Sequence, residues 1–177
     1  MSVEQFWRLV EESGSPCVCD PEEQCEKITE KLSELPLQEL RNFYISHRQV
    51  LHAGYSEGLF HACFIMLNYI SDDTFEDYIN WLILNGRSRF EEALRNPDSI
   101  ADFCDVDDPV EECIGEPLLY VCEEAYDGDI EDIESADRAQ FPPNVHVTWP
   151  AVGVLQQKYP RLFERYWDED NGYEPSC

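Results

Sequence analysis

The chain has 177 residues, a length that fits one domain with a sizeable core, and its hydrophobic content of 43% is typical of a globular protein. The formal net charge of −26 argues against direct binding to nucleic-acid backbones and to anionic membrane surfaces, because both need clusters of Lys and Arg. The same charge favours solubility and cationic partners.

The first residues predict a helix that stays in the mature chain. Ser2 and Gln5 form a capping box ahead of an apolar stripe that starts at Phe6. No basic flank and no unbroken apolar run precede this stripe, so we expect no signal peptide and a cytoplasmic location. In that compartment the eight cysteines are expected to be mostly reduced.

Two further helices are expected before residue 55. Asp20 is placed to cap the first of them, with Pro21 at its first helical position. Pro36 begins the second helix. Its apolar stripe consists of Leu37, Leu40, Tyr44 and Leu51.

The middle of the chain predicts three more helices. Residues 58–70 form the most apolar window, which is too short to span a bilayer and has the length of a buried helix. Ser71 or Asp72 caps the next helix, which Gly86 ends in the αL conformation. Residues 87–95 form a short helix that stops before Pro97, because the residue preceding a proline is disfavoured in the α region.

The composition changes after residue 100. Residues 100–140 contain 15 acidic residues and one basic residue. Within this stretch, residues 117–126 still predict a buried helix, whereas 104–116 and 127–140 predict acidic surface loops. Residues 141–150 should be extended, and YPRLFERYW then predicts a last short helix. The predicted fold is therefore an all-α, compact multi-helix single domain that spans residues 1–177.

The dipeptide Asp72-Asp73 has two interpretations. Carboxylates at a helix N-terminus accept hydrogen bonds from unpaired N–H groups and complement the helix dipole, which accounts for both residues. Alternatively, they form a carboxylate pair in a pocket with Arg87. A helix from 72 to 85 is about 20 Å long, so its two ends cannot meet, and Arg87 would need carboxylates from another helix.

This second interpretation defines a set of candidate binding residues. Tyr78 and Trp81 would form pocket walls, although both also fit a buried core. Glu123 and Glu124 would be the carboxylates that face Arg87. The candidate residues are Asp72, Asp73, Tyr78, Trp81, Arg87, Glu123 and Glu124.

Other motifs point to no cofactor, metal or nucleophile. Cys17, Cys19 and Cys25 have the spacing C-x-C-x5-C, which lacks the paired clips of a structural zinc site. Residues 127–134 lack the glycine that a calcium-binding loop has at its sixth position. No P-loop, G-x-S-x-G or H-E-x-x-H motif occurs in the chain.

The central block resembles an uncharacterised bacterial domain family. The resemblance rests on S-D-D-x-F at 71–75, W-L-I at 81–83, G-R-x-x-F-E-x-A-L at 86–94 and P-D-S-(L/I)-A at 97–101. It implies an all-helical single domain and names no reaction. The acidic insert DVDDPVEECIGE and the extra cysteines depart from the family's usual pattern.

These observations lead to two main hypotheses about function. The first is a non-enzymatic cytosolic interaction or regulatory domain that binds a basic protein partner, as an immunity protein binds a cationic toxin, or a small ligand. The second is an enzyme or small-molecule-binding protein, in which Asp72 and Asp73 act as acid, base or metal ligand and Arg87 holds an anion. A mimic of DNA is a weaker third alternative, because its carboxylates would need an ordered face.

Overall fold

The structure is a computed structural model that describes residues 1–15, 20–104, 106–135 and 143–175. Within these ranges the chain forms helices and no β-strand, which confirms the predicted all-α fold. The helices are α1 (Val3–Ser13), α2 (Pro21–Ser33), α3 (Leu37–Gly54), α4 (Glu57–Leu67), α5 (Asp72–Leu84), α6 (Arg87–Arg95), the 3-10 helix η1 (Pro97–Asp102), α7 (Pro109–Glu112), α8 (Pro117–Glu124), α9 (Glu131–Glu134), α10 (Val152–Lys158) and α11 (Pro160–Tyr166).

Side-chain caps confirm the predicted starts of α1 and α2. The Ser2 hydroxyl accepts a hydrogen bond from the backbone N–H of Gln5, whose side chain accepts one from the Ser2 N–H. Asp20 accepts from the N–H of Glu23 and caps α2. Gly86 lies between α5 and α6, directly after the C-cap residue Asn85, and it has a positive φ of 91°, although its ψ of 161° lies outside the αL region.

The described parts of the two predicted acidic loops, 104–116 and 127–140, keep their charged side chains exposed but include short helices. Residues 104–116 contain the one-turn helix α7, and Cys104, Pro109 and Cys113 are buried there. Ile133 in α9 is also buried. Residues 136–140 lie outside the described residues. Pro109, Cys113 and Ile133 are the buried residues of these two short helices and their ends, and they pack their apolar surface into the core.

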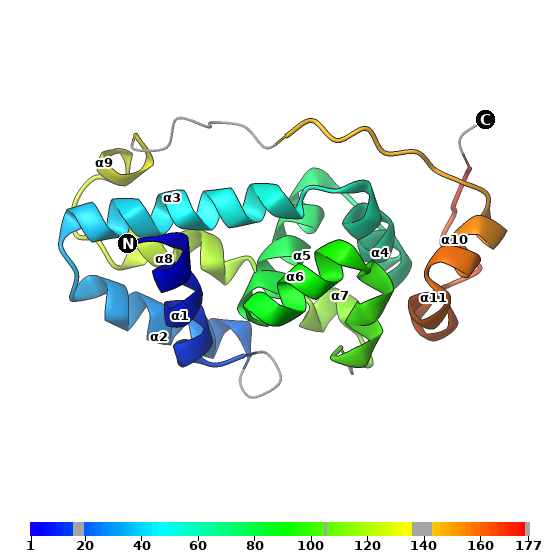
Figure 1. Cartoon of the computed structure of the whole chain (residues 1–177), viewed down its shortest axis with the longest axis horizontal. Helices are drawn as coiled ribbons and strands as arrows, with labels where there is room; N and C mark the ends of the chain where they lie inside the picture. Colours follow the sequence, from blue (N-terminus) through cyan, green and yellow to red (C-terminus); the bar gives the residue numbers. More distant parts are fainter. Residues whose placement is uncertain (16–19, 105, 136–142, 176–177) are drawn as a thin grey trace.

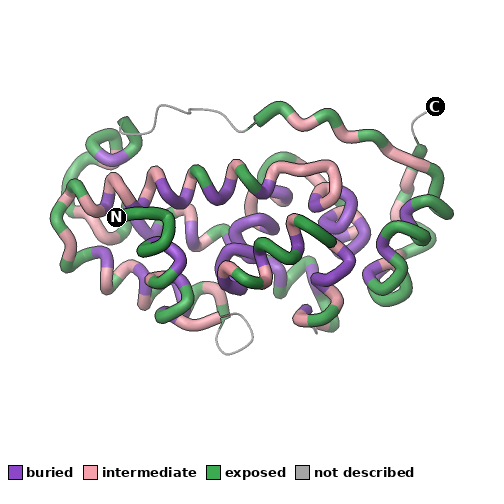
Figure 2. Tube along the Cα trace, viewed as in Figure 1, coloured by how far each residue is buried: buried purple, intermediate pink, exposed green. Residues whose placement is uncertain are grey.

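Helix α5 lies in the middle of the core. Figure 2 shows buried positions concentrated around α4 and α5, and Phe75 and every residue from Tyr78 to Leu84 are buried. Gly115 contacts the backbone of this helix: its N–H donates to the carbonyl of Asp77 at 3.0 Å. A Cβ atom at Gly115 would lie 2.1 Å from the backbone nitrogen of Trp81, so only glycine fits there.

The C-terminal segment packs against one end of the helical body. α1, α2, α3 and α8 lie at the opposite end, and residues 143–151 run along the molecule towards α10 and α11 (Figure 1). These residues form neither helix nor strand, as expected for an extended segment, whereas α10 and η1 were not predicted. In the described segments, no helix combines the length and the apolar character needed to cross a membrane.

The extended segment is fixed to α4 by two polar side chains. The ring nitrogen Nε2 of His61 lies 2.6 Å from the carbonyl oxygen of Thr148, to which it donates. Glu57 accepts a hydrogen bond from the backbone N–H of Thr148 at 2.9 Å. Burial lowers the pKa of His61, so the imidazole is neutral at pH 7.

Candidate functional site

The residues at the start and middle of α5 do not form an open pocket. Asp72 and Asp73 are exposed in the first turn, and Ser71 caps the helix by accepting from the N–H of Thr74 at 3.2 Å. Tyr78 and Trp81 are buried in the core, with their rings stacked at a centroid distance of 5.8 Å. They contribute packing between helices rather than pocket walls.

Arg87 is held by carboxylates other than the expected ones. Its guanidinium donates to Glu91 at 2.6 Å and to Glu4 of α1 at 2.5 Å, and these two hydrogen bonds raise its pKa. Glu123 and Glu124 are exposed on α8, where Glu124 accepts from Thr29 at 3.4 Å. The seven candidate residues therefore lie at separate places and do not converge on one site.

Two of the three cysteines with the C-x-C-x5-C spacing, Cys17 and Cys19, lie outside the described residues. Among the residues that are described, no three His, Cys, Asp or Glu side chains come together to hold a metal ion.

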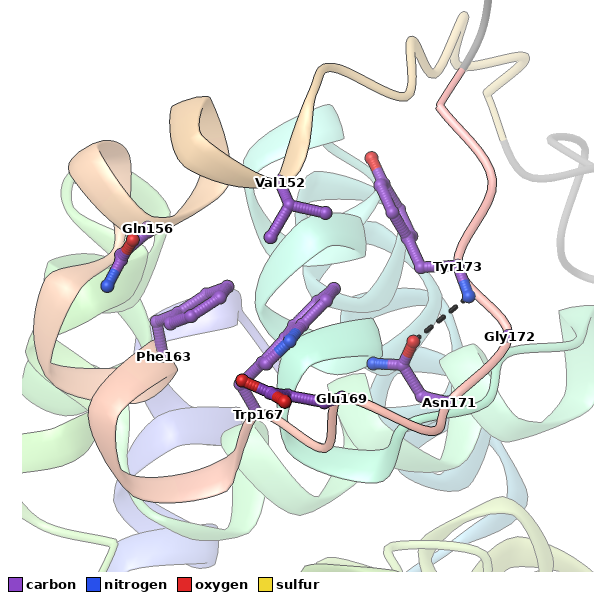
Figure 3. A pocket seen from close by; sticks show the side chains of 8 residues that line it. All are labelled: Val152, Gln156, Phe163, Trp167, Glu169, Asn171, Gly172 and Tyr173. Atoms are coloured by element: carbon purple, nitrogen blue, oxygen red, sulfur yellow. Dashed lines mark hydrogen bonds between the residues drawn. The ribbon is translucent and has the colours of Figure 1, made fainter.

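A pocket of about 420 Å³ lies between α10, α11 and the C-terminal tail (Figure 3). Figure 3 shows the rings of Phe163 and Trp167 side by side below Val152, with Tyr173 on the tail and Glu169 below them. The lining residues are Val152, Gln156, Phe163, Trp167, Glu169, Asn171, Gly172 and Tyr173.

Three aromatic rings form the wall of this pocket. Phe163 projects from α11 and Trp167 directly follows this helix, and their rings stack at 4.6 Å with an angle of 14°. Tyr173 meets Trp167 edge to face at 5.5 Å. Phe64 of α4 packs behind Tyr173 at 5.3 Å, which ties the wall to the core.

Asn68 fixes the tail that closes the pocket. It ends α4 in the αL conformation with φ of 55°, and its amide nitrogen donates to the carbonyl of Tyr166 at 3.1 Å. Its oxygen accepts from the backbone N–H of Asp168 at 3.1 Å and from the amide of Asn171 at 3.2 Å. The side chain of Asn171 in turn accepts from the N–H of Tyr173 at 3.0 Å (Figure 3).

Tyr173 is also anchored at its hydroxyl. The phenol donates to the carbonyl oxygen of Pro150 at 2.6 Å. Burial raises the pKa of Tyr173, so the phenol stays protonated and keeps donating at neutral pH. The tail and the extended segment therefore hold each other in place around the pocket.

Asp98 of η1 fixes the start of α11. One carboxylate oxygen accepts from the backbone N–H groups of Arg161 and Leu162, both at 3.0 Å. The other accepts from the guanidinium of Arg161 at 2.9 Å, and this guanidinium also binds Asp102. Because α11 has no side-chain cap of its own, a carboxylate from a distant helix supplies that cap.

Two polar side chains at the pocket are available to a ligand. Within the described part of the chain, Glu169 has no hydrogen-bond or ion-pair partner, and the same holds for the amide of Gln156. Val152, which lines the pocket, is 37% exposed. Aromatic rings beside an unpaired carboxylate attract a cation, and this arrangement contains no nucleophile with a base.

Sequence patterns gave little indication of this pocket. Two features of the sequence point to the pocket: Phe163 and Trp167 are spaced i, i+4, and an acidic run precedes Tyr173. Their convergence depends on Asn68, which is about 100 residues away in the chain.

A comparison with family models matches residues 1–128 to a family described as "Protein of unknown function (DUF4240)". Comparisons with curated proteins and with solved structures gave no match. The pocket residues, from Val152 to Tyr173, lie outside the matched region.

Proposed function

We propose that this chain, which belongs to the DUF4240 family of proteins of unknown function, is a binding domain for a basic protein partner. In this proposal a Lys or Arg side chain of the partner enters the pocket between α10, α11 and the tail. The acidic surface attracts the partner, and the aromatic wall gives the specific contact.

The unpaired carboxylate of Glu169 beside three aromatic rings carries the proposal. A cation over an aromatic ring gains about 0.5–1 kcal/mol at an exposed site, and a nearby carboxylate adds a similar amount. The local cations do not neutralise this carboxylate: Arg161 binds Asp98, and Arg165 donates to the carbonyl of Cys104 at 2.8 Å.

Two features favour a protein over a small free cation. Val152 of α10 lines the pocket and is 37% exposed, and it gives an apolar surface that a polypeptide covers and a small ammonium ion does not. The net charge of −26 speeds association with a basic surface through long-range attraction.

An enzyme that uses Asp72, Asp73 and Arg87 finds no support in these positions. Arg87 is already paired with Glu4 and Glu91, and the aspartates lie at the other end of α5. The proposal is therefore limited to binding.

The test uses a fluorescently labelled peptide of alternating glycine and arginine, with fluorescence anisotropy as the measurement. We expect saturable binding that weakens at high salt, because exposed charges are screened. Glu169→Gln and Trp167→Leu should each weaken binding by about threefold to tenfold, the equivalent of roughly 1 kcal/mol.

Matched controls separate the pocket from general charge attraction. Glu174→Gln removes the same charge from an exposed residue of the same tail that does not line the pocket, so it should leave the affinity nearly unchanged. A peptide with norleucine in place of arginine should not bind. Equal losses of affinity in Glu169→Gln and Glu174→Gln would overturn the assignment of the pocket.

A further inference from the structure

Two cysteine side chains lie next to each other in the core beneath α11. The Sγ atoms of Cys104 and Cys113 are 3.9 Å apart, and each residue is only 2% exposed. Cys104 follows η1, and Cys113 is the residue after α7. The two thiols are not joined by a disulfide.

The surroundings distinguish Cys104 from the other buried cysteines. A hydrogen bond from the Cys113 thiol lowers the pKa of Cys104, and Tyr166, whose hydroxyl lies 3.6 Å from the Cys104 sulfur, acts in the same direction. Burial instead raises the pKa of Cys63, and it raises that of Cys122 to about 12. Among Cys63, Cys104 and Cys122, Cys104 is therefore the residue whose surroundings favour the reactive thiolate.

We propose that Cys104 and Cys113 are a site of reversible oxidative modification, at which a peroxide converts the two thiols into an intramolecular disulfide. The Cys104 thiolate attacks one peroxide oxygen, the O–O bond breaks, and a sulfenic acid forms while hydroxide leaves and takes up the proton that Cys104 gave up. The Cys113 sulfur then attacks the Cys104 sulfur, and the sulfenic oxygen leaves as water with the Cys113 proton. In total, two thiols and one hydrogen peroxide give one disulfide and two waters.

The geometry permits this bond after a small movement. A disulfide has an S–S distance of about 2.05 Å, so the sulfur atoms must approach by about 2 Å. Cys113 directly follows a helix of four residues, and its neighbour Ile114 is 38% exposed. Opening of so short a helix gives a peroxide access to the pair without unfolding the core.

The modification would lie where the C-terminal helix is attached. The backbone carbonyl of Cys104 accepts from the guanidinium of Arg165 at 2.8 Å and from the hydroxyl of Tyr166 at 3.2 Å. Both residues belong to α11, which also carries Phe163 of the aromatic wall. The chemistry of the thiol pair does not depend on the binding function proposed above.

The test treats the folded full-length chain with hydrogen peroxide, blocks the remaining thiols with N-ethylmaleimide and digests the protein with a protease that cleaves after glutamate. Glu111 and Glu112 lie between the two cysteines, so their fragments stay joined only if a disulfide connects them. We expect joined fragments that have lost two hydrogen atoms and that separate with dithiothreitol, and an N-ethylmaleimide adduct on Cys122.

Three variants complete the experiment. Cys122→Ser changes another buried thiol and should leave the link intact. Cys113→Ser should abolish the link and leave a sulfenic acid on Cys104 that dimedone captures, whereas Cys104→Ser should give no dimedone adduct on Cys113. In the wild-type chain, separate fragments, a link from Cys104 to another cysteine, or a link that forms only in guanidinium would overturn the proposal.

Discussion

Replacement of Asp98 tests whether the C-terminal helix depends on the family domain. Asp98 lies in the region matched by the family, and its carboxylate binds the first turn of α11, outside that region. Asp98→Ala removes the acceptor of two backbone N–H groups, and the N–H of Leu162 is buried. The pocket wall should loosen together with α11, because Phe163 projects from this helix.

The expected loss follows from the three hydrogen bonds of Asp98. Each backbone N–H left without its partner costs about 1–2 kcal/mol. The ion pair with Arg161 adds only about 0.5 kcal/mol, because the arginine side chain is 44% exposed and solvent screens it. Asp98→Ala should therefore lower the free energy of unfolding by about 3 kcal/mol.

Asp98→Asn is the matched comparison, since it keeps one oxygen that can accept the backbone hydrogen bonds. It should cost only about 1 kcal/mol, and Arg161→Met should cost about 0.5 kcal/mol. The assay is urea denaturation followed by circular dichroism, with hydrogen exchange of the α11 amides to locate the change. Equal stability of the wild-type chain and Asp98→Ala, or equal losses in the Ala and Asn variants, would refute the argument.

Two further changes test the core. Gly115→Ala should cost at least about 3 kcal/mol in urea denaturation, because its Cβ would lie 2.1 Å from the Trp81 nitrogen, whereas Gly153→Ala, with open space around it, should cost nothing. Burial lowers the pKa of His47 to about 4, so the unfolded chain binds the proton more tightly and stability falls as the pH drops from about 6.5 to about 4. Wild type should lose roughly 2–3 kcal/mol more than His47→Gln between pH 7 and pH 4.5; parallel pH curves would contradict this.

Local sequence signals were sufficient for most helix boundaries. Ser2, Asp20 and Pro97 act through contacts within a few residues, so their roles could be predicted without knowledge of the fold. The helix at 87–95 has the predicted limits. The sequence left Tyr78 and Trp81 either as pocket walls or as core residues, and the structure places both in the core.

The candidate site could not be predicted in the same way. Asp72, Asp73 and Arg87 were candidate residues because they border an apolar run in the sequence. The two aspartates and the arginine lie at opposite ends of α5, however, so they are far apart in space. The partners of Arg87 come from α1 and from its own helix, and the periodicity of α5 carries no information about them.

The sequence by itself determined that this is an acidic, all-helical chain, because caps, helix breakers and apolar periodicity act over one or two turns. Only the tertiary structure decided which side chains meet: Asp98 with the start of α11, Asn68 with the tail, and Cys104 with Cys113. The two kinds of information differ because a helix needs only its own neighbours in the chain, whereas these contacts depend on how packing places distant segments.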